Sequence, residues 1–266
     1  MKRIESYEQI QSFVQYIRNQ RNGFVTNFYW DSNKHPYWIA DGSFEYEQFE
    51  TCIFLVHKQE SFSTLFFISS GYKPIVEIIH SIQLEKPVIV DLVCKGKGDT
   101  ELALFKSMGF DMYQSLYRMV HVGKMTHDNW SIDSRVQFGK ENDVKLVYDA
   151  LQENFDPLAE QLPSFKEVTD FALRNQILII KDNAKLCGFL IFEILGMSWY
   201  LRYWYTSQEY RNQGIGAALL RASLIYGKET KRQILWVIDR NDNAIKRYEH
   251  YGFTRENMND YVMIKK

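Results

Sequence analysis

A glycine-containing turn between a strand-like and a helix-like segment constrains this chain more than any other feature. Residues 199–206 form an apolar run, and residues 217–227 have the spacing of an amphipathic helix. Between them, residues 211–216 read Arg-Asn-Gln-Gly-Ile-Gly. Such glycines let several backbone N–H groups converge on one anion, and the next helix adds its unpaired first-turn amides. The pattern predicts a strand–turn–helix unit that binds a phosphate group.

The segments after this turn fit an α/β arrangement. Small or apolar residues recur at helical spacing after Gly214. The unbroken apolar run 234–238 predicts a strand that is buried on both faces. A second helix is expected to begin at residue 242 or 243 and to end at Gly252, with Tyr248 on its apolar face.

The order of these parts resembles the GNAT acetyltransferase superfamily. Residues 208–220 are similar to its acetyl-CoA pyrophosphate loop and the helix that follows, and residues 241–253 are similar to its second cofactor motif. The resemblance covers roughly residues 132–266. The chain departs from the family pattern at Gln208, where many members have proline, and at residues 212–213, where many have Gly-Lys.

The resemblance implies a mixed α/β sheet and a site for acetyl-CoA, without a metal. Backbone amides of the loop are expected to hold the pyrophosphate, with positive charge from Arg211, and the end of the preceding strand is expected to pair with the pantetheine arm. The expected cofactor-binding residues are Tyr205, Thr206, Arg211, Asn212, Gln213, Gly214, Ile215, Gly216, Ala217 and Asn241.

The implied reaction is direct acetyl transfer from acetyl-CoA to a primary amine. Tyr248 is the candidate general acid, because a phenol with a pKa of about 10 can protonate a thiolate whose conjugate acid has a pKa of about 8.5. Two alternatives stay open: Tyr248 is a core residue on the buried helix face, and Asn241 only caps its helix. An aminoacyl or other acyl transferase on the same fold, and a non-catalytic acyl-CoA-binding module, also fit the sequence.

The general base and the acceptor cannot be read from the sequence. Glu193 and Glu209 are candidates for the base, beside ordinary surface carboxylates. Residues 154–163 lie where GNAT-like folds usually line the acceptor pocket. A solvated loop is the first interpretation of this segment, and an acceptor site in which Asp156 and Glu160 attract a cationic amine is the alternative. A small molecule or a peptide fits as the amine acceptor.

A repeat relates the two halves of the chain. Gly71 and Gly214 are 143 residues apart (214 − 71), and the Met-Gly-Phe at 108–110 has the same offset from the Tyr-Gly-Phe at 251–253. The chain is therefore interpreted as two tandem GNAT-like units, residues 1–124 and 132–266, joined by a linker near residues 124–133.

The first copy lacks the features that the chemistry needs. Lys73 stands in place of Gly216, and Phe105 stands in place of Tyr248. We therefore expect residues 1–124 to be a degenerate GNAT-like domain without a cofactor motif. An unrelated α/β domain is the alternative.

Several elements are predicted from local pattern. In the second unit these are a strand at 136–138, helices near 143–153 and 164–174, a hairpin of 177–181 with 186–195, and a strand at 198–206. In the first they are strands at 65–68, 87–94 and 116–120, and helices at 75–82 and 100–108.

Composition narrows the class of protein. The 266 residues carry 32 Lys and Arg against 33 Asp and Glu, so no global field favours nucleic acid or an acidic membrane surface. The N-terminus lacks the apolar core of a signal peptide, and the three cysteines are far apart in apolar runs. We expect a cytoplasmic enzyme without membrane or nucleic-acid partners.

Overall fold

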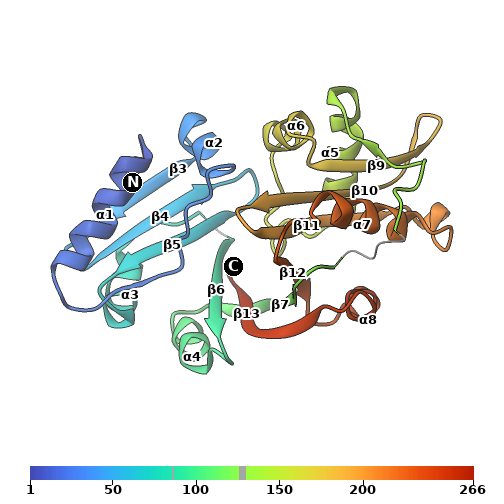
Figure 1. Ribbon diagram of the computed structural model, residues 1–266. Helices are drawn as coiled ribbons and strands as arrows, with labels where there is room; N and C mark the ends of the chain where they lie inside the picture. Colours follow the sequence, from blue (N-terminus) through green and yellow to red (C-terminus); the bar gives the residue numbers. More distant parts are fainter. Residues whose placement is uncertain (86, 126–129) are drawn as a thin grey trace. The chain divides into compact units, whose positions relative to one another are not determined.

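The computed structural model describes residues 1–85, 87–125 and 130–266. By packing, the chain divides into two compact units. The N-terminal unit contains residues 1–115 and 258–266, and the C-terminal unit contains residues 116–257. Each is a mixed α/β sheet with helices on its faces (Figure 1). The predicted linker, 124–133, includes residues 126–129, which lie outside the described residues.

In the N-terminal unit, α1 and α2 pack on one face of the sheet and α3 and α4 on the other. Among the described strand pairs of this unit, only β5 and β6 are parallel. The short strand β2 also pairs with β5 and is antiparallel to it. The sheet order is β1 (Lys2–Arg3), β3 (Phe44–Gln48), β4 (Cys52–Lys58), β5 (Ser63–Ser69), β6 (Val88–Lys95) and β13 (Thr254–Lys265). The other elements are α1 (Tyr7–Asn19), β2 (Val25–Thr26), α2 (His35–Ala40), α3 (Tyr72–Ile78), η1 (Ile79–Ser81) and α4 (Asp99–Ser107).

The C-terminal unit repeats this plan. Helices α5 and α6 pack on one face of its sheet, and α7 and α8 pack on the other. The sheet order is β7 (Asp111–Val122), β12 (Arg232–Ile238), β11 (Ser198–Thr206), β10 (Lys185–Leu195), β9 (Ile177–Asp182) and β8 (Gln137–Phe138). The other elements are η2 (Glu141–Asp143), α5 (Val144–Asn154), α6 (Phe165–Leu173), η3 (Gln208–Tyr210), α7 (Ile215–Tyr226) and α8 (Asp242–His250).

The elements follow the predicted offset. Tyr72 and Ile215, the first residues of α3 and α7, are 143 residues apart (215 − 72), and so are Asp99 and Asp242, the first residues of α4 and α8 (242 − 99). Strands β6 and β12 occupy the same place in the two sheets, each parallel to the strand before its preceding helix. The two halves of the sequence therefore share one topology.

The two compact units do not coincide with the two halves of the sequence repeat, because the final strand of each half pairs with the sheet of the other unit. Residues 258–265 of β13 pair with β6 in the N-terminal unit, whereas residues 116–122 of β7 pair with β12 in the C-terminal unit. Each unit is thus completed by the strand that ends the other half of the sequence.

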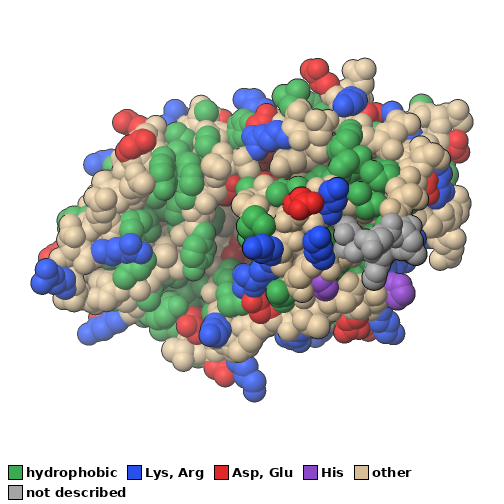
Figure 2. Space-filling model, viewed as in Figure 1, with side chains coloured by type: hydrophobic (Ala, Val, Ile, Leu, Met, Phe, Trp, Pro, Cys, Tyr) green, Lys and Arg blue, Asp and Glu red, His purple; other side chains and the backbone are tan. Residues whose placement is uncertain are grey.

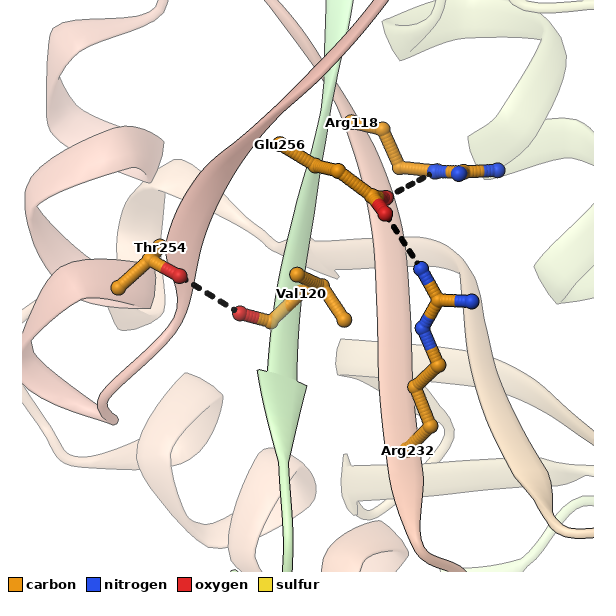
Figure 3. Close-up of polar contacts among 5 residues, drawn as sticks. All are labelled: Arg118, Val120, Arg232, Thr254 and Glu256. Atoms are coloured by element: carbon orange, nitrogen blue, oxygen red, sulfur yellow. Dashed lines mark hydrogen bonds and ion pairs between the residues drawn. The ribbon is translucent and has the colours of Figure 1, made fainter.

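The C-terminal unit holds β7 through side chains as well as through its ladder. Glu256 lies in the first part of β13, and its carboxylate accepts from Arg118 of β7 and from Arg232 of β12, each at 2.6 Å (Figure 3). The hydroxyl of Thr254 donates to the carbonyl of Val120 at 3.3 Å. One carboxylate therefore joins two neighbouring strands of this sheet.

The surface drawn in Figure 2 carries acidic and basic side chains interspersed with one another. This distribution fits the net charge of −1. Among the described residues, no helix is both long enough and apolar enough to cross a bilayer. No group of three potential metal ligands occurs in that part of the chain either.

Candidate functional site

The predicted phosphate loop joins β11 to α7. Gly214 is the N-cap of α7 and has the left-handed φ of 75°, while Asn212 has a φ of 63°. Gly214 offers no capping side chain, so the first amides of a 12-residue helix lack a partner from their cap. Residues 211–214 are exposed. The loop therefore presents backbone donors and the positive end of a helix dipole to solvent.

Gly216, the second glycine of the loop, lies in the first turn of α7 against β11. It is buried, and a Cβ added there would lie 3.1 Å from both Thr206 Oγ1 and a ring carbon of Trp204. The missing side chain lets α7 approach β11 closely. Ile215 is buried beside it, and Ala217 is half-buried.

Arg135, which the sequence did not single out, lies at this loop. Its guanidinium donates to the carbonyl of Gln213 at 3.3 Å. Asp133 holds the same guanidinium through two bonds, of 2.7 and 3.0 Å, and the hydrogen bonds from Arg135 lower the pKa of Asp133 to about 2. A tertiary contact of this kind has no local signature in sequence.

Strand β11 separates from β12 beside the loop. Their parallel ladder runs from Ser198 to Leu201 of β11, and within the described chain residues 203–206 pair with β10 alone. A bulge in the pairing with β10 falls at Arg202. One edge of the last five residues of β11 is therefore open.

Alternation along β11 decides which backbone groups face this open edge. The N–H of Ser207 donates to Cys187 of β10, so residues two apart from it, including Tyr205, also turn their backbone groups toward β10. The groups of Trp204 and Thr206 turn to the open edge. Of the two residues named from sequence, Thr206 has this placement and Tyr205 does not.

Tyr248 packs against the same part of β11. It is 7% exposed on α8, with its ring centroid 5.6 Å from that of Trp204 and 6.0 Å from that of Phe253. Burial raises the pKa of Tyr248 well above its ordinary value, so the phenol stays protonated. Asn241 begins the helix, and its side chain accepts from the N–H of Ala244 at 3.2 Å. Asn241 is therefore the N-cap of α8.

The buried indole nitrogen of Trp204 has no hydrogen-bond partner among the described residues. A buried donor without a partner is costly. It lies where β11 separates from β12, beside Tyr248. A polar ligand group in this position would satisfy it, so the residues present fit a ligand that runs along the open edge.

The candidate carboxylates differ in their surroundings. Glu193 is 1% exposed and forms an ion pair with Arg202. Glu209 is exposed, 3.9 Å from Lys185. Glu160 lies in the loop between α5 and α6, and its charge acts on Tyr248. The structure therefore brings Glu160, rather than Glu209, within electrostatic reach of the candidate acid.

Residues 144–253, which include the loop and Tyr248, match the family described as acetyltransferase (GNAT) family. The C-terminal unit is a GNAT domain. This family membership supports an acyltransferase. The GNAT match begins at α5 and ends just after α8, so it contains every cofactor residue predicted from the sequence.

Solved GNAT structures share the fold over four fifths of the chain or more. An acetyltransferase of the GNAT family from Colwellia psychrerythraea is 14% identical, with 99% of this chain and 98% of that chain covered and a TM-score of 0.60. A GCN5-related N-acetyltransferase from Sphaerobacter thermophilus is 14% identical over 81% of this chain and 80% of its own, with a TM-score of 0.55.

A tandem GNAT protein from the clavulanic acid biosynthesis pathway is 10% identical, covering 80% of this chain and 78% of its own, with a TM-score of 0.55. At these identities the likeness shows the fold, and it agrees with the two-unit GNAT arrangement. No curated protein matches the sequence.

Proposed function

We propose that the protein is an N-acetyltransferase that moves the acetyl group of acetyl-CoA to a primary amine, with one cofactor site in its C-terminal unit. The observation that carries this proposal is the coincidence, within a GNAT domain, of an open β11 edge with the uncapped N-terminus of α7. The loop supplies donors for a pyrophosphate, and the strand edge supplies backbone groups for an amide-containing arm.

The proposed contacts follow the geometry. Backbone amides of residues 213–217 hold the pyrophosphate, and Arg211 and Arg135 border them with positively charged groups. Backbone groups of Thr206 and Trp204 pair with the pantetheine arm. Asn241 and Asn212 shape the site through the cap of α8 and the left-handed turn of the loop.

Tyr248 is the proposed general acid. When bound, acetyl-CoA supplies a thioester whose sulfur needs a proton as it leaves. Tyr248 remains protonated because of its burial, and it lies beside the open edge through its contact with Trp204. The core packing of Tyr248 and its proposed role are compatible, since the packing fixes the ring and thereby aims the hydroxyl.

The N-terminal unit is proposed to bind no acetyl-CoA. Its strand β5 ends at Ser69 and α3 begins at Tyr72, so only two residues stand where the C-terminal unit has an eight-residue loop, 207–214. Its Gly71 has extended backbone, with φ of 174°, and forms no left-handed turn. The sequence range 1–124 would then serve as scaffold.

Calorimetric titration of acetyl-CoA into the wild type and into Gly214→Glu tests the site. We expect one acetyl-CoA per chain for the wild type, and loss of binding in the variant, because the carboxylate repels phosphate and the residue must adopt a left-handed conformation. At about 100 times Kd, the ligand should stabilise the wild type by about 2.7 kcal/mol.

Gly196→Glu is the matched control. Gly196 also has a left-handed φ, of 59°, with open space around its Cβ, but it lies in the turn between β10 and β11. It should bind acetyl-CoA as the wild type does. Two acetyl-CoA per chain, or none, would contradict the proposal. Binding without turnover of any amine would favour a non-catalytic acyl-CoA-binding module, and turnover only with other acyl donors would favour the other acyl transferases.

A further inference from the structure

The loop between α5 and α6 is fastened to β11 by one tyrosine. The hydroxyl of Tyr203 donates to the carbonyls of Glu160 and Gln161, each at 3.0 Å. Gln161 takes the left-handed φ of 45°, a conformation that a residue with a side chain keeps only when its contacts impose it. The loop backbone around Glu160 is therefore held in one conformation against the strand.

This fastening point lies next to the open edge of β11. Tyr203 follows the bulge at Arg202 and precedes Trp204, whose ring contacts Tyr248. Successive side chains on a strand point to opposite faces, so Tyr203 faces α5 and α6 while Trp204 faces α7 and α8. Glu160 and Tyr248 thus approach the same few residues of β11 from opposite faces of the sheet.

The carboxylate of Glu160 is also held in place. It accepts from the N–H of Asp156 at 2.9 Å, and among the described residues it forms no ion pair. Other buried carboxylates of this unit are neutralised or capped: Glu193 pairs with Arg202, and Glu167 accepts from the N–H that begins α6. Unlike Glu193, Glu160 has no positively charged partner within the described part of the chain.

Aromatic rings surround the loop that carries Glu160. Phe155 packs edge-on against Tyr203, with ring centroids 5.5 Å apart at 89°, and its centroid is 6.5 Å from that of Tyr205. Burial raises the pKa of Glu160, with Asp156 adding a repulsive charge and a backbone N–H of Asp156 opposing both. A carboxylate of raised pKa beside aromatic faces suits a cation that also has an apolar body.

We propose that Glu160 binds the ammonium group of the acceptor and takes its proton, and that the acceptor is a monocationic primary amine on an apolar or aromatic body. This assignment rests on the proposed acetyltransferase function. It names a residue from the α5–α6 loop, and not Glu193 or Glu209, as the base.

In the proposed reaction, the ammonium group of the acceptor loses two protons, one to Glu160 and one to Tyr248. Glu160 takes one proton from the ammonium, and the freed lone pair forms the C–N bond to the acetyl carbon as the C–S bond breaks. The departing sulfur takes the phenol proton of Tyr248. The second proton of the nitrogen restores that phenol, and Glu160 releases its own proton to water. The net products are the amide, the thiol and one proton.

Glu160→Gln tests this assignment, with 2-phenylethylamine as the probe. Glu153→Gln is the matched control, because Glu153 is an exposed carboxylate at the end of the neighbouring α5. With the protein saturated by CoA, calorimetry should show amine affinity about 10- to 100-fold lower in Glu160→Gln, since a hydrogen bond to a charged group is lost. Acetyl-CoA affinity and melting temperature should stay at wild-type values.

Turnover gives the second readout. Thiol release with saturating acetyl-CoA should fall about 100-fold in kcat for Glu160→Gln, and the acidic limb of its pH profile should disappear. The titratable groups that face Glu160 are Asp156 in its own loop, Tyr203 on the same face of β11 and Tyr248 on the opposite face.

Two failures are distinguishable. If the wild type acetylates amines and Glu160→Gln matches it in amine affinity and kcat, Glu160 is not the base and the proposed function stands. If the wild type binds no acetyl-CoA or acetylates no primary amine, the proposed function falls and this assignment falls with it. A preference for amino acids, whose carboxylate Glu160 would repel, would overturn the proposed class of acceptor.

Discussion

In each unit the two parallel strands, β5 and β6 or β11 and β12, separate after a short ladder, and the two units differ in what lies along the edge that this separation exposes. In the N-terminal unit the ladder of β5 with β6 covers only Ser63 and Thr64, and the chain itself then fills the gap. Asn27 donates to the carbonyls of Leu65 and Asp91 and accepts from the N–H of Phe67. In the C-terminal unit, no described segment lies along the corresponding edge of β11.

This difference shows how one topology gives a strand edge that is filled in one unit and open in the other. Strand β2 pairs with Ile68 and Ser69, on the edge of β5 that β6 has left, so the backbone of β5 finds partners within its own unit. The end of β11 pairs on one edge only within the described residues. Residues 25–27 therefore distinguish the filled strand edge of the N-terminal unit from the open edge of the C-terminal unit.

The largest expected effect, on kcat, distinguishes Tyr248 from Phe105, the aromatic residue at the equivalent position of the N-terminal unit. Tyr248→Phe should lower kcat about 100-fold with little change in acetyl-CoA affinity, because it removes only a proton donor. Steady-state thiol release and calorimetry measure the two quantities. Unchanged kcat would remove Tyr248 from the mechanism.

Phe105→Tyr is the reciprocal variant in the N-terminal unit. Phe105 is fully buried between Phe67 and Phe110, so an added hydroxyl should cost about 1–3 kcal/mol of stability. Its kcat should equal that of the wild type. A change in kcat would mean that the N-terminal unit takes part in catalysis.

Acid should weaken the N-terminal unit through two histidines. Burial, with the charge of Lys34, lowers the pKa of His35 and of His57 to about 3. The unfolded chain binds these protons near pH 6.5, so their contribution is complete above that pH and declines as the pH falls toward 3. In that window each histidine should lower the free energy of unfolding by up to about 1.4 kcal/mol per pH unit.

Thermal unfolding between pH 7 and 5 measures this effect. Saturating acetyl-CoA should hold the C-terminal unit folded and so separate the two transitions. The lower transition should lose its steep pH dependence in the double variant His35→Gln, His57→Gln. If both transitions shift equally with pH in the wild type, the histidines are not the cause.

A smaller effect on stability is expected at Asn27, whose side chain bridges β5 and β6 where the two strands separate. Asn27→Ala leaves one N–H and two carbonyls without their side-chain partner and should destabilise that unit by about 2 kcal/mol. Asn22→Ala, at an exposed position nearby, is the control and should be neutral. Acetyl-CoA stoichiometry should stay at one; a second equivalent would show that Asn27 alone had closed a working site.

Much of this architecture is predictable from local pattern. The helix predicted from residue 217 forms from Ile215 to Tyr226, and the strand predicted at 234–238 forms at Arg232–Ile238. The glycine turn and the repeat offset are encoded in short motifs, whose physical requirements are local. These features lie on single elements or their ends, where propensity and capping decide the structure.

The remaining features depend on tertiary packing. Strands β7 and β13 stand at equivalent places in the two halves of the sequence, so no local pattern tells which sheet each one joins. Strand β2 has two residues, too few for a periodicity. Arg135 reaches the loop across 78 residues of sequence. In each case the deciding contact joins segments that are distant in the chain.

The division of the strands sets synthesis and packing in opposite orders. Residues 258–265, which complete the sheet begun by β1, leave the ribosome only after the whole C-terminal unit, residues 116–257. At about 5–20 residues per second, those 142 residues (257 − 115) take roughly 7–28 s to translate. Throughout that time the edge of β6 has no β13 to pair with. Strand β7, which ends the first half of the repeat as β13 ends the second, has already been synthesised. The nascent chain must therefore keep its first sheet unfinished until its last strand arrives.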